Sequence, residues 1–489
     1  MKRRRDSIES ARVAVEVDDE PESQQLGASL ADLPTHITTD ILLRLPVKSI
    51  LICKCVCRSL KAMISDPHFA KLHFQHSQSG FMIRAKDKKL SGIVYLLERE
   101  TEKFENDDDD SQFCCCENSI MRPECNCHFI LEHKVKLPFR GAKLVWGNRD
   151  ESKKRGRPTG RENHYFNFEG EDGKFAVVNS CNGLICLCDR ERDYFVVCNP
   201  ITGEFIRLPQ TSRIGKTNKF SIQEIYAGFG FQPKNNEYKV VRILRGLQFY
   251  HGIMAAEVHT LGTSTWRNVE VNSMYFYHLR FPTCVSGALH WIGSYHGTLS
   301  ILCFDFESER FRSFPTPPCL YQSCTESITM GELRGSLYIC DSFSKGTPFV
   351  MWIMKEYGFK ESWTKIFSFD TMSSYRWPFG GLYWPVKHFK NGSAILMYHS
   401  YNFFIYYEPG KDGFKIFKVR GTQSRFDVIP HIPSFISLKD VVKGDNIEVL
   451  NVHSRYEEFK FMEENADLFL AKVNDKVGIL YTISTDDEE

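Results

Sequence analysis

Between residues 32 and 69 the apolar positions recur at the spacing of short amphipathic helices. The first helix is expected to begin at Pro34, since proline suits the first turn of a helix, and to end before Pro46, which cannot continue it. Its apolar face consists of Ile37, Ile41, Leu42 and Leu45. A second apolar helix is predicted over residues 47–57 and a short third helix over residues 58–64, closed by Ser65-Asp66-Pro67.

These three helices form a unit too short to bury much surface by itself, and isolated units of this size are only marginally stable. Its apolar residues also exceed those that three short helices can cover. Both features favour a helical module whose apolar face docks on a partner. The alternative is an N-terminal helical hairpin packed on the main domain.

From about residue 80 onward the pattern changes to short strands that alternate apolar and polar residues and end in turn sequences. The strands recur in a loose repeat, of which residues 182–209 are the clearest copy; residues 287–318, 335–370 and 391–421 are others. The leading glycines Gly183, Gly287, Gly335 and Gly392 are separated by 104, 48 and 57 residues. Because the first interval holds two repeats, the period is about fifty residues, in the range of kelch-like propeller blades.

Four-stranded units of this kind bury both faces and protect their edges when they stack radially. We therefore expect an all-β body that forms a β-propeller of six or seven blades; an open pair of β-sandwiches is the competing architecture. We expect the ring to close by pairing of the final segment, which contains IEVLNV, LFLAKV and VGILYTI, with a strand near residues 81–97.

The composition of the 489-residue chain agrees with such a body, because aromatic residues reach 13% while charged residues stay at 25%. The net charge of +1 gives no global field that would steer the protein to nucleic acid or membranes. No apolar run approaches the ~18 residues that a membrane-spanning helix requires. The 17 cysteines lack the spacing of a disulfide framework, so we expect them to be reduced, in the nucleus or the cytoplasm.

Both ends of the chain and one internal segment do not fit the repeat. Residues 1–29 are expected to form a disordered arm; their basic KRRR start lacks the apolar region of a signal peptide and is either a nuclear import signal or a solvated end. Residues 481–489 form an acidic tail. Residues 98–165 are expected to be an insertion with an acidic run, a cysteine-rich run and a basic run.

The cysteine-rich run places several potential metal ligands close together. They are Cys114, Cys115, Cys116, Cys125, Cys127 and His128. Thiolates and imidazole can hold zinc, but this spacing is not that of a known zinc finger. We therefore expect surface thiols in a loop, with no metal and no other cofactor.

The basic run at residues 153–161 contains Arg155-Gly156-Arg157-Pro158, which matches the core of the AT-hook. In that motif an extended Arg-Gly-Arg enters the narrow minor groove of A·T-rich DNA, where the negative potential attracts arginine. A short basic core also occurs by chance in loops, and a single hook binds weakly. DNA contact by Arg155 and Arg157 is therefore the minor alternative.

The sequence contains no G-x-S-x-G, H-E-x-x-H or P-loop motif of an enzyme. GFGFQP at residues 228–233 lacks the third glycine of a dinucleotide fingerprint and is expected to be a blade strand. Tryptophans at comparable places in the repeats are expected to be core residues between blades and not a binding cage. They are Trp266, Trp291, Trp352, Trp363, Trp377 and Trp384. A propeller enzyme whose site assembles only in three dimensions stays open as an alternative.

The segment LPTHITTDILLRLPVKSILICKCVCRSL, followed by ISDPHF, resembles the F-box of plant F-box proteins. The resemblance implies a module that docks on the Skp-type adaptor of a cullin-based ubiquitin ligase. The adaptor-facing residues that it implies are Leu33, Pro34, Ile37, Ile41, Leu42, Leu45, Pro46, Val47, Ile50, Leu51, Val56 and Cys57. The chain departs from the family at Leu60, where tryptophan is usual, and at Cys53 and Lys54, where arginine and phenylalanine are frequent. The smaller anchor at Leu60 is expected to weaken docking by ~1–2 kcal/mol without abolishing it.

The segments SCNGLICL, VCNPITGEFIRLP, GALHWI and MKEYGFKESWTKIF resemble the F-box-associated domain of the same plant proteins, over about residues 165–420. That resemblance implies a propeller-like body that captures substrates. The expected fold is an α+β multidomain protein: an F-box helical domain at residues 30–76 and a β-propeller-like domain at residues 77–480, between the arm and the tail.

The function implied by the resemblance is the substrate-recognition subunit of an SCF-type ubiquitin ligase, which performs no chemistry itself. Its partners are then the Skp-type adaptor, through it the cullin and RING subunits, and a protein target. Residues 274–280 and 375–384 are candidates for target binding by their aromatic and arginine content. The alternative is a nuclear chromatin-associated binding protein that uses the basic loop, with the F-box in a non-degradative assembly.

Overall fold

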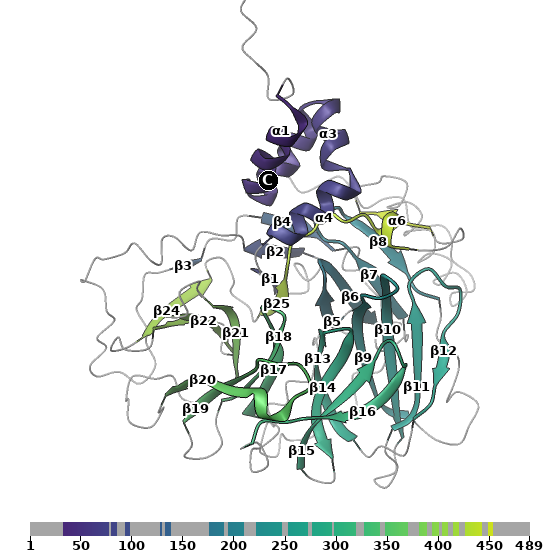
Figure 1. Ribbon diagram of the computed structural model, residues 1–489, viewed down its shortest axis with the longest axis vertical. Helices are drawn as coiled ribbons and strands as arrows, with labels where there is room; N and C mark the ends of the chain where they lie inside the picture. Colours follow the sequence, from purple (N-terminus) through teal and green to yellow (C-terminus); the bar gives the residue numbers. More distant parts are fainter. Residues whose placement is uncertain are drawn as a thin grey trace, which may run out of the picture. The chain divides into compact units, whose positions relative to one another are not determined.

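In the computed structural model the chain contains an N-terminal helical part and a ring of β-sheets (Figure 1). The structure describes residues 33–77, 80–85, 93–97, 128–129, 133–137, 176–189, 194–209, 222–246, 253–271, 276–295, 298–318, 327–342, 348–369, 381–388, 394–400, 403–408, 414–419, 426–442 and 448–452. By their internal contacts the residues divide into two units, Met1–Arg44 and Leu45–Glu489. Across the described residues, no helix is both long enough and apolar enough to cross a membrane.

Helix α1 (Thr35–Arg44) belongs to the first unit. The carbonyl oxygen of Pro34 accepts hydrogen bonds from the amides of Ile37 (2.9 Å) and Thr38 (3.1 Å), so the helix begins where the proline predicted. The side chain of Leu42 is fully buried.

The second unit opens with α2 (Val47–Val56) and α3 (Arg58–Ile64), as predicted. Cys57 separates the two helices in an extended conformation, and its sulfur accepts a 3.4 Å hydrogen bond from the amide of Leu60. Leu60, within α3, is buried.

A fourth helix, α4 (Pro67–His76), follows where the helical module was expected to close. Asp66 is its N-cap and accepts a 2.7 Å hydrogen bond from the amide of His68, while Pro67 occupies the first turn. The helical part therefore has one helix more than the three that were expected. The Asp66-Pro67 pair was interpreted only as the end of the third helix, but it also caps and begins α4.

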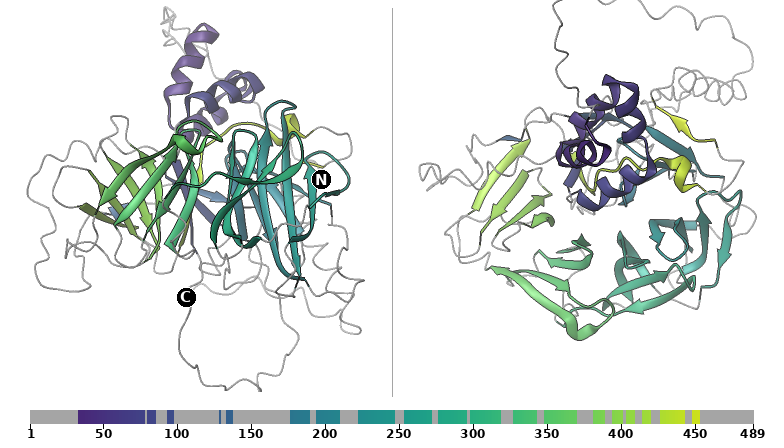
Figure 2. Two further views of the ribbon diagram at one scale, coloured as in Figure 1. Left: turned by 60° about the horizontal axis from the view of Figure 1, so that its bottom comes forward. Right: turned by 45° about the horizontal axis from the view of Figure 1, so that its top comes forward.

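The strands form six sheets arranged as the blades of a propeller (Figure 2). Blade 1 consists of β5 (Ala176–Cys181), β6 (Leu184–Asp189), β7 (Tyr194–Cys198) and β8 (Glu204–Arg207), and blade 2 of β9 (Ile222–Gln232), β10 (Glu237–Gly246), β11 (Ile253–Thr260) and β12 (Arg267–Val269). Blade 3 consists of β13 (Phe276–Val285), β14 (Ala288–Tyr295), β15 (Thr298–Asp305) and β16 (Arg310–Phe314). Blade 4 consists of β17 (Ile328–Leu333), β18 (Ser336–Asp341), β19 (Phe349–Met354) and β20 (Trp363–Phe369), and blade 5 of β21 (Tyr383–His388), β22 (Ile395–His399), β23 (Phe403–Tyr407) and β24 (Phe414–Val419).

Blade 6 closes the ring with strands from both ends of the described chain: β25 (Phe426–His431), β1 (Gly80–Ala85), β2 (Ile93–Leu97) and β4 (His133–Lys136). The first-named strand of each blade is its inner strand. The inner strands β25, β5, β9, β13, β17 and β21 each contact the next in this order, and β21 contacts β1 of blade 6. The propeller prediction is therefore confirmed, with six blades, and the pair of open sandwiches is excluded.

The predicted closing strand near residues 81–97 is correct, but its predicted partner is wrong. β1 pairs antiparallel with β25, which follows blade 5 directly and so fills the next inner position. Within IEVLNV, the short strand β26 (Leu450–Asn451) pairs instead with β8 of blade 1. LFLAKV and VGILYTI lie outside the described residues.

Two strands fall within residues 98–165, which the sequence pattern suggested to be an insertion. β4 is the outer strand of blade 6, with Val135 opposite Val94 of β2. β3 (His128–Phe129) pairs in parallel with β24 of blade 5. This segment therefore contributes strands to two blades.

The repeated glycines occupy the tight turns between the inner and second strands. The pairs Asn182-Gly183, Ser286-Gly287 and Arg334-Gly335 have φ values of 48° and 80°, 50° and 74°, and 53° and 80°. Two successive positive φ angles are typical of two-residue hairpin turns, in which the second position favours glycine. The long interval between Gly183 and Gly287 spans blade 2, as the period predicted. Gly392 lies outside the described residues.

The core lies between neighbouring blades, where hydrophobic residues from facing sheets pack together. Trp266 packs against blade 1, and its indole N–H donates a 2.9 Å hydrogen bond to the carbonyl of Pro209. Trp363 repeats this arrangement two blades later with the carbonyl of Pro315 (3.2 Å). These tryptophans therefore join blades, as predicted; Trp291 is also buried, Trp352 and Trp384 pack partly buried, and Trp377 lies outside the described residues.

Candidate protein-binding surfaces

The twelve residues implied as adaptor-facing divide into three groups by exposure. Buried side chains are Leu42, Val47 and Ile50; half-buried are Ile41, Leu45, Leu51 and Cys57; exposed are Leu33, Pro34, Ile37, Pro46 and Val56. The three buried residues pack inside this chain, so their side chains are not available to a partner in this conformation. The exposed residues are the ones that offer surface.

Helix α2 presents an exposed face with two large aliphatic side chains. Ile52 is 57% exposed and Val56 is 69% exposed, and the two lie one helical turn apart. Lys48 and Cys55 are exposed on the same side of the helix. The sequence reasoning did not nominate Ile52, because the polar residues of α2 do not gather on one side and its pattern does not reveal which side faces outward.

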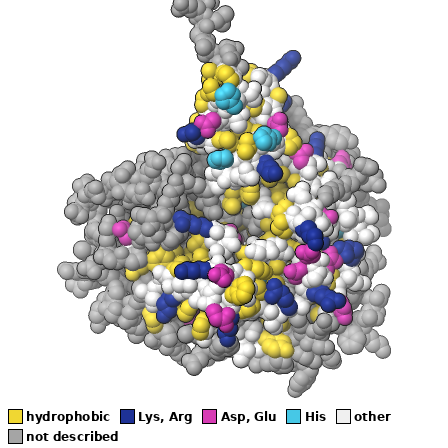
Figure 3. All heavy atoms as spheres, viewed as in Figure 1, with side chains coloured by type: hydrophobic (Ala, Val, Ile, Leu, Met, Phe, Trp, Pro, Cys, Tyr) yellow, Lys and Arg dark blue, Asp and Glu magenta, His cyan; other side chains and the backbone are white. Residues whose placement is uncertain are grey.

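The first unit offers a similar pair, with Leu33 at 38% and Ile37 at 40% exposure. Among the described residues, the other exposed large hydrophobic side chain is Phe359, in the loop after β19. Exposed apolar side chains are thus concentrated in the helical part, and hydrophobic side chains reach the surface there on the face drawn in Figure 3. Exposed apolar pairs of this kind mark a candidate protein-binding surface on each of the two units.

Helix α4 packs on residues that follow the closing strand of the propeller. The imidazole of His73 meets the ring of Phe435 edge-on, with centroids 4.8 Å apart, and Phe69 lies 6.2 Å from the same ring. Burial lowers the pKa of His73 to about 4, with a smaller contribution from His76. A neutral His73 is therefore part of the apolar contact between α4 and the segment after β25.

That segment, residues 432–437, is fixed to blade 1 by the buried side chain of Asn199. The amide nitrogen of Asn199 donates hydrogen bonds to the carbonyls of Ser434 (3.0 Å) and Ile436 (2.8 Å). Its oxygen accepts one from the amide of Ile201 (2.9 Å). The short helix α6 (Leu438–Val441) follows. Its Leu438 amide donates a 2.8 Å hydrogen bond to the carboxylate of Glu204 in blade 1. This chain of contacts runs from α4 to blade 1 within the second unit.

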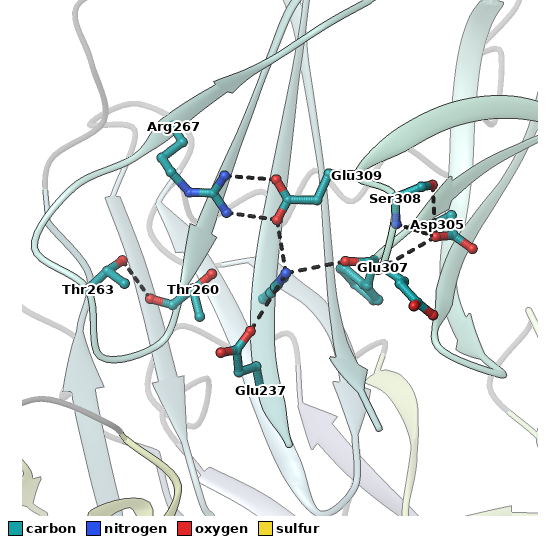
Figure 4. A network of polar contacts seen from close by, with 10 residues as sticks. Glu237, Thr260, Thr263, Arg267, Asp305, Glu307, Ser308 and Glu309 are labelled. Carbon is teal, nitrogen blue, oxygen red and sulfur yellow. Dashed lines mark hydrogen bonds and ion pairs between the residues drawn. The ribbon is translucent and has the colours of Figure 1, made fainter. Parts of the chain in front are cut away.

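A polar network joins blades 2 and 3 (Figure 4). Arg267 donates two hydrogen bonds, of 2.8 and 2.7 Å, to the two carboxylate oxygens of Glu309. The buried ammonium of Lys239 lies 2.9 Å from Glu309 and 3.8 Å from Glu237. The hydrogen bonds from Arg267, followed by those from Lys239, hold the pKa of Glu309 below its usual value. Because each charge has an opposite partner, this network is structural.

Several sequence-based candidates lie outside the described residues: Arg155, Arg157, and all members of the cysteine-rich run except His128 in β3. In the part of the chain that the structure describes, no three His, Cys, Asp or Glu side chains are placed to hold a metal ion. The structure describes part of each candidate stretch for target binding. Residues 276–280 form the start of the inner strand β13, and residues 381–384 lead into the inner strand β21.

Comparison with known families gives two matches, one to the helical part and one to the propeller. Residues 30–72 match the F-box domain, and residues 148–442 match the family described as F-box associated beta propeller domain. The second match covers more than half of the chain and includes the strands from β5 to β25.

Curated relatives from Arabidopsis thaliana match over most of their length. The chain is 25% identical over 454 residues to "F-box protein At3g07870", covering 85% of this chain and 94% of the relative. It is 25% identical to "F-box/kelch-repeat protein At3g23880" (74% and 87% covered) and 24% identical to "F-box protein CPR1" (69% and 73% covered). Among solved structures, "Structure of Dos1 propeller" matches at 10% identity and a TM-score of 0.26 over 54% of this chain and 68% of that chain, too low to support an argument.

Proposed function

The chain belongs to the F-box proteins that carry an F-box-associated β-propeller, and from that premise we propose that it is the target-recognition subunit of an SCF-type ubiquitin ligase. In this role the F-box docks on a Skp-type adaptor while the propeller captures a protein target. The observation that carries the proposal is the exposed aliphatic face of α2 within the matched F-box.

The exposed fractions of the F-box side chains indicate which of them can contact the adaptor. We assign adaptor contact to Ile52 and Val56 of α2 and, separately, to Leu33 and Ile37 of the first unit. Burial of an isoleucine or leucine side chain contributes roughly 1.5–3 kcal/mol, so a few such residues supply most of a stable interface. The buried Leu42, Val47 and Ile50 act through the shape of the helices that they support.

The subunit contributes proximity and no bond-making chemistry of its own. Binding the adaptor and the target on one chain raises the effective concentration of target lysines near the ubiquitin-charged enzyme. The contacts of α4 with Phe435, and of Asn199 with residues 434–436, support such a role because they fix the last F-box helix to the propeller.

We also propose that the protein acts in a reducing compartment, the nucleus or the cytoplasm. None of the ten cysteines that the structure describes is in a disulfide, and most are buried in the blades. Burial raises the pKa of Cys186 and Cys340, among others, so these thiols stay protonated and inert.

A reconstitution experiment tests the proposal. The whole chain is mixed with purified Skp-type adaptor, cullin and RING subunits and analysed by size-exclusion chromatography. Co-elution in one complex is the expected result. Separate elution of this chain, under conditions in which a curated F-box relative co-elutes with the same subunits, would refute the assignment.

A further inference from the structure

The inner strand β13 of blade 3 has an irregular backbone. Among the described inner strands, it alone contains non-glycine residues with positive φ. Two non-glycine residues, His278 and Phe281, have φ values of 53° and 55°. The pairing with β14 shifts register twice, between Tyr277 and Arg280 and between Arg280 and Thr283. Positive φ angles at bulky residues cost about 1–3 kcal/mol each, and such strain and bulges concentrate at functional sites.

Neighbouring residues are shaped to accept this irregular backbone. A Cβ atom at Gly293 of β14 would lie 2.7 Å from the carbonyl oxygen of Tyr277, so only glycine lets the bulge approach its neighbour. The hydroxyl of Tyr226 in β9 accepts a 3.1 Å hydrogen bond from the amide of His278. The bulge is therefore supported by two strands and is a defined feature of the fold.

Cationic and aromatic side chains gather around the bulge. The guanidinium of Arg245 lies 4.6 Å from the centroid of the Tyr277 ring, and that of Arg280 lies 4.7 Å from the centroid of Phe281. The side chain of His278 is exposed, while those of Arg280 and Phe281 are half-exposed. Residues 276–295, which form β13, its turn and β14, contain no carboxylate, whereas Glu224 of β9 lies opposite Arg245 in the pairing with β10.

The cluster lies at one edge of the ring. At this edge the inner strand of each blade begins and the strand paired with it ends. Tyr277, near the start of β13 in blade 3, therefore lies beside Arg245, near the end of β10 in blade 2. The Asn199-bound residues 434–436 follow the end of an inner strand, at the opposite edge. The ring of Phe281, which directly follows the nominated residues 274–280, lies 6.2 Å from that of Trp384, the last residue of the other nominated stretch, at an interplanar angle of 75°.

We propose that this cluster, composed of Tyr277, His278, Arg280 and Phe281 with Arg245 behind them, is the target-binding subsite of the propeller and that it takes an acidic peptide segment with aromatic side chains. Arg280 and His278 supply the donors for carboxylate groups, and the rings of Tyr277 and Phe281 supply apolar contact area. Arg and Tyr are the residue types that dominate binding energy at protein interfaces. The proposal rests on the receptor function, whose test is adaptor binding.

The test is a titration of the full chain, in complex with its adaptor, into a fluorescein-labelled glutamate–tyrosine copolymer, followed by anisotropy. Saturable binding is expected, and Arg280→Glu is expected to raise the Kd at least tenfold. A lysine–tyrosine copolymer of equal length is expected not to bind. Arg334→Glu, an equal charge change in the exposed turn at the opposite edge, is the matched control and is expected to leave the Kd unchanged.

Equal losses for Arg280→Glu and Arg334→Glu would overturn the subsite, as would equal binding of both copolymers or no binding of either. Adaptor binding by the Arg280→Glu variant is measured in the same samples and is expected to equal that of the wild type. Failure of the peptide titration with intact adaptor binding would therefore refute the subsite alone. Replacing glutamates by phosphoserines in a defined peptide then distinguishes a phosphorylated target from a carboxylate-rich one.

Discussion

The imidazole of His290 joins two neighbouring blades, because its Nε2 atom lies 2.9 Å from the hydroxyl oxygen of Tyr357. His290 belongs to β14 of blade 3, whereas Tyr357 follows β19 of blade 4. The Nδ1 atom lies 3.3 Å from the carbonyl oxygen of Thr283, to which it donates, so Nε2 accepts a hydrogen bond from Tyr357. Burial lowers the pKa of His290 to about 4, which keeps the ring neutral.

This arrangement predicts that stability falls on acidification below pH 6.5. The pKa of His290 is about 4 in the folded chain and 6.5 when unfolded, so its contribution is complete above pH 6.5 and is lost as the pH falls toward 4. Between pH 7 and pH 5 this residue alone costs about 2 kcal/mol. Buried His259 and His431, with pKa values lowered by burial to about 4 and about 3, act in the same direction.

Urea unfolding at the two pH values measures this effect. The difference in unfolding free energy between pH 7 and pH 5 is expected to be about 2 kcal/mol smaller for His290→Gln than for the wild type. The exposed His278→Gln serves as the control and should retain the wild-type difference. An unchanged pH dependence in His290→Gln would contradict the buried neutral imidazole.

The buried carboxamide of Asn199 predicts a large loss of stability on its removal. Asn199→Leu leaves the carbonyls of Ser434 and Ile436 and the amide of Ile201 without this partner. Buried polar groups that lose their partners cost about 1–3 kcal/mol each, and partial relaxation makes about 3 kcal/mol a reasonable expectation for the site. Chemical denaturation gives the value, with exposed Asn268→Leu on β12 as the control. A loss below about 1 kcal/mol would argue against these bonds.

The ion pair between Arg242 and Glu257 is buried within blade 2, with 2.6 Å between nitrogen and oxygen. Arg242→Met removes the guanidinium that lies against the buried carboxylate of Glu257 and is expected to cost about 3–5 kcal/mol. Adding Glu257→Leu is expected to restore most of that stability, because apolar side chains of similar volume replace a buried pair at little cost. Double-mutant analysis by urea unfolding provides the measurement.

Lys234→Met, in an exposed ion pair with Glu307, is the control for the buried pair and is expected not to change the unfolding midpoint. A double variant no more stable than Arg242→Met would show that the two side chains do not depend on each other.

The sequence predicted the repeated features of the fold well, since they depend on local chemistry. Gly183, Gly287 and Gly335 mark the hairpin turns because their positive φ angles favour glycine. Trp266 and Trp363 follow the same repeat because each fills the space beside the preceding blade. Signals of this kind recur at a fixed spacing and can be recognised without knowledge of distant contacts.

The features that the sequence did not predict depend on long-range contacts or on local ambiguity. Several segments after blade 5 are apolar enough to form the inner strand of blade 6. The structure uses β25, the first of them along the chain, and its apolar content does not distinguish it from the later segments. The outward face of α2 was ambiguous because its polar residues do not gather on one side, so the exposed Ile52 was not nominated whereas the buried Val47 and Ile50 were. The bulge at His278 depends on Gly293, which lies on another strand.

The most direct test of the account is the affinity of the chain for a purified Skp-type adaptor, measured by biolayer interferometry for the wild type, Ile52→Asp/Val56→Asp and Phe359→Asp. The wild type and Phe359→Asp, which places one such carboxylate at a comparably exposed apolar residue outside the F-box, are expected to bind with equal affinity. Ile52→Asp/Val56→Asp is expected to bind at least 100-fold more weakly, equivalent to about 2.7 kcal/mol, with an unchanged unfolding midpoint. Undiminished binding by that double variant, or no binding by the wild type, would contradict the assignment of α2 as the adaptor-docking surface.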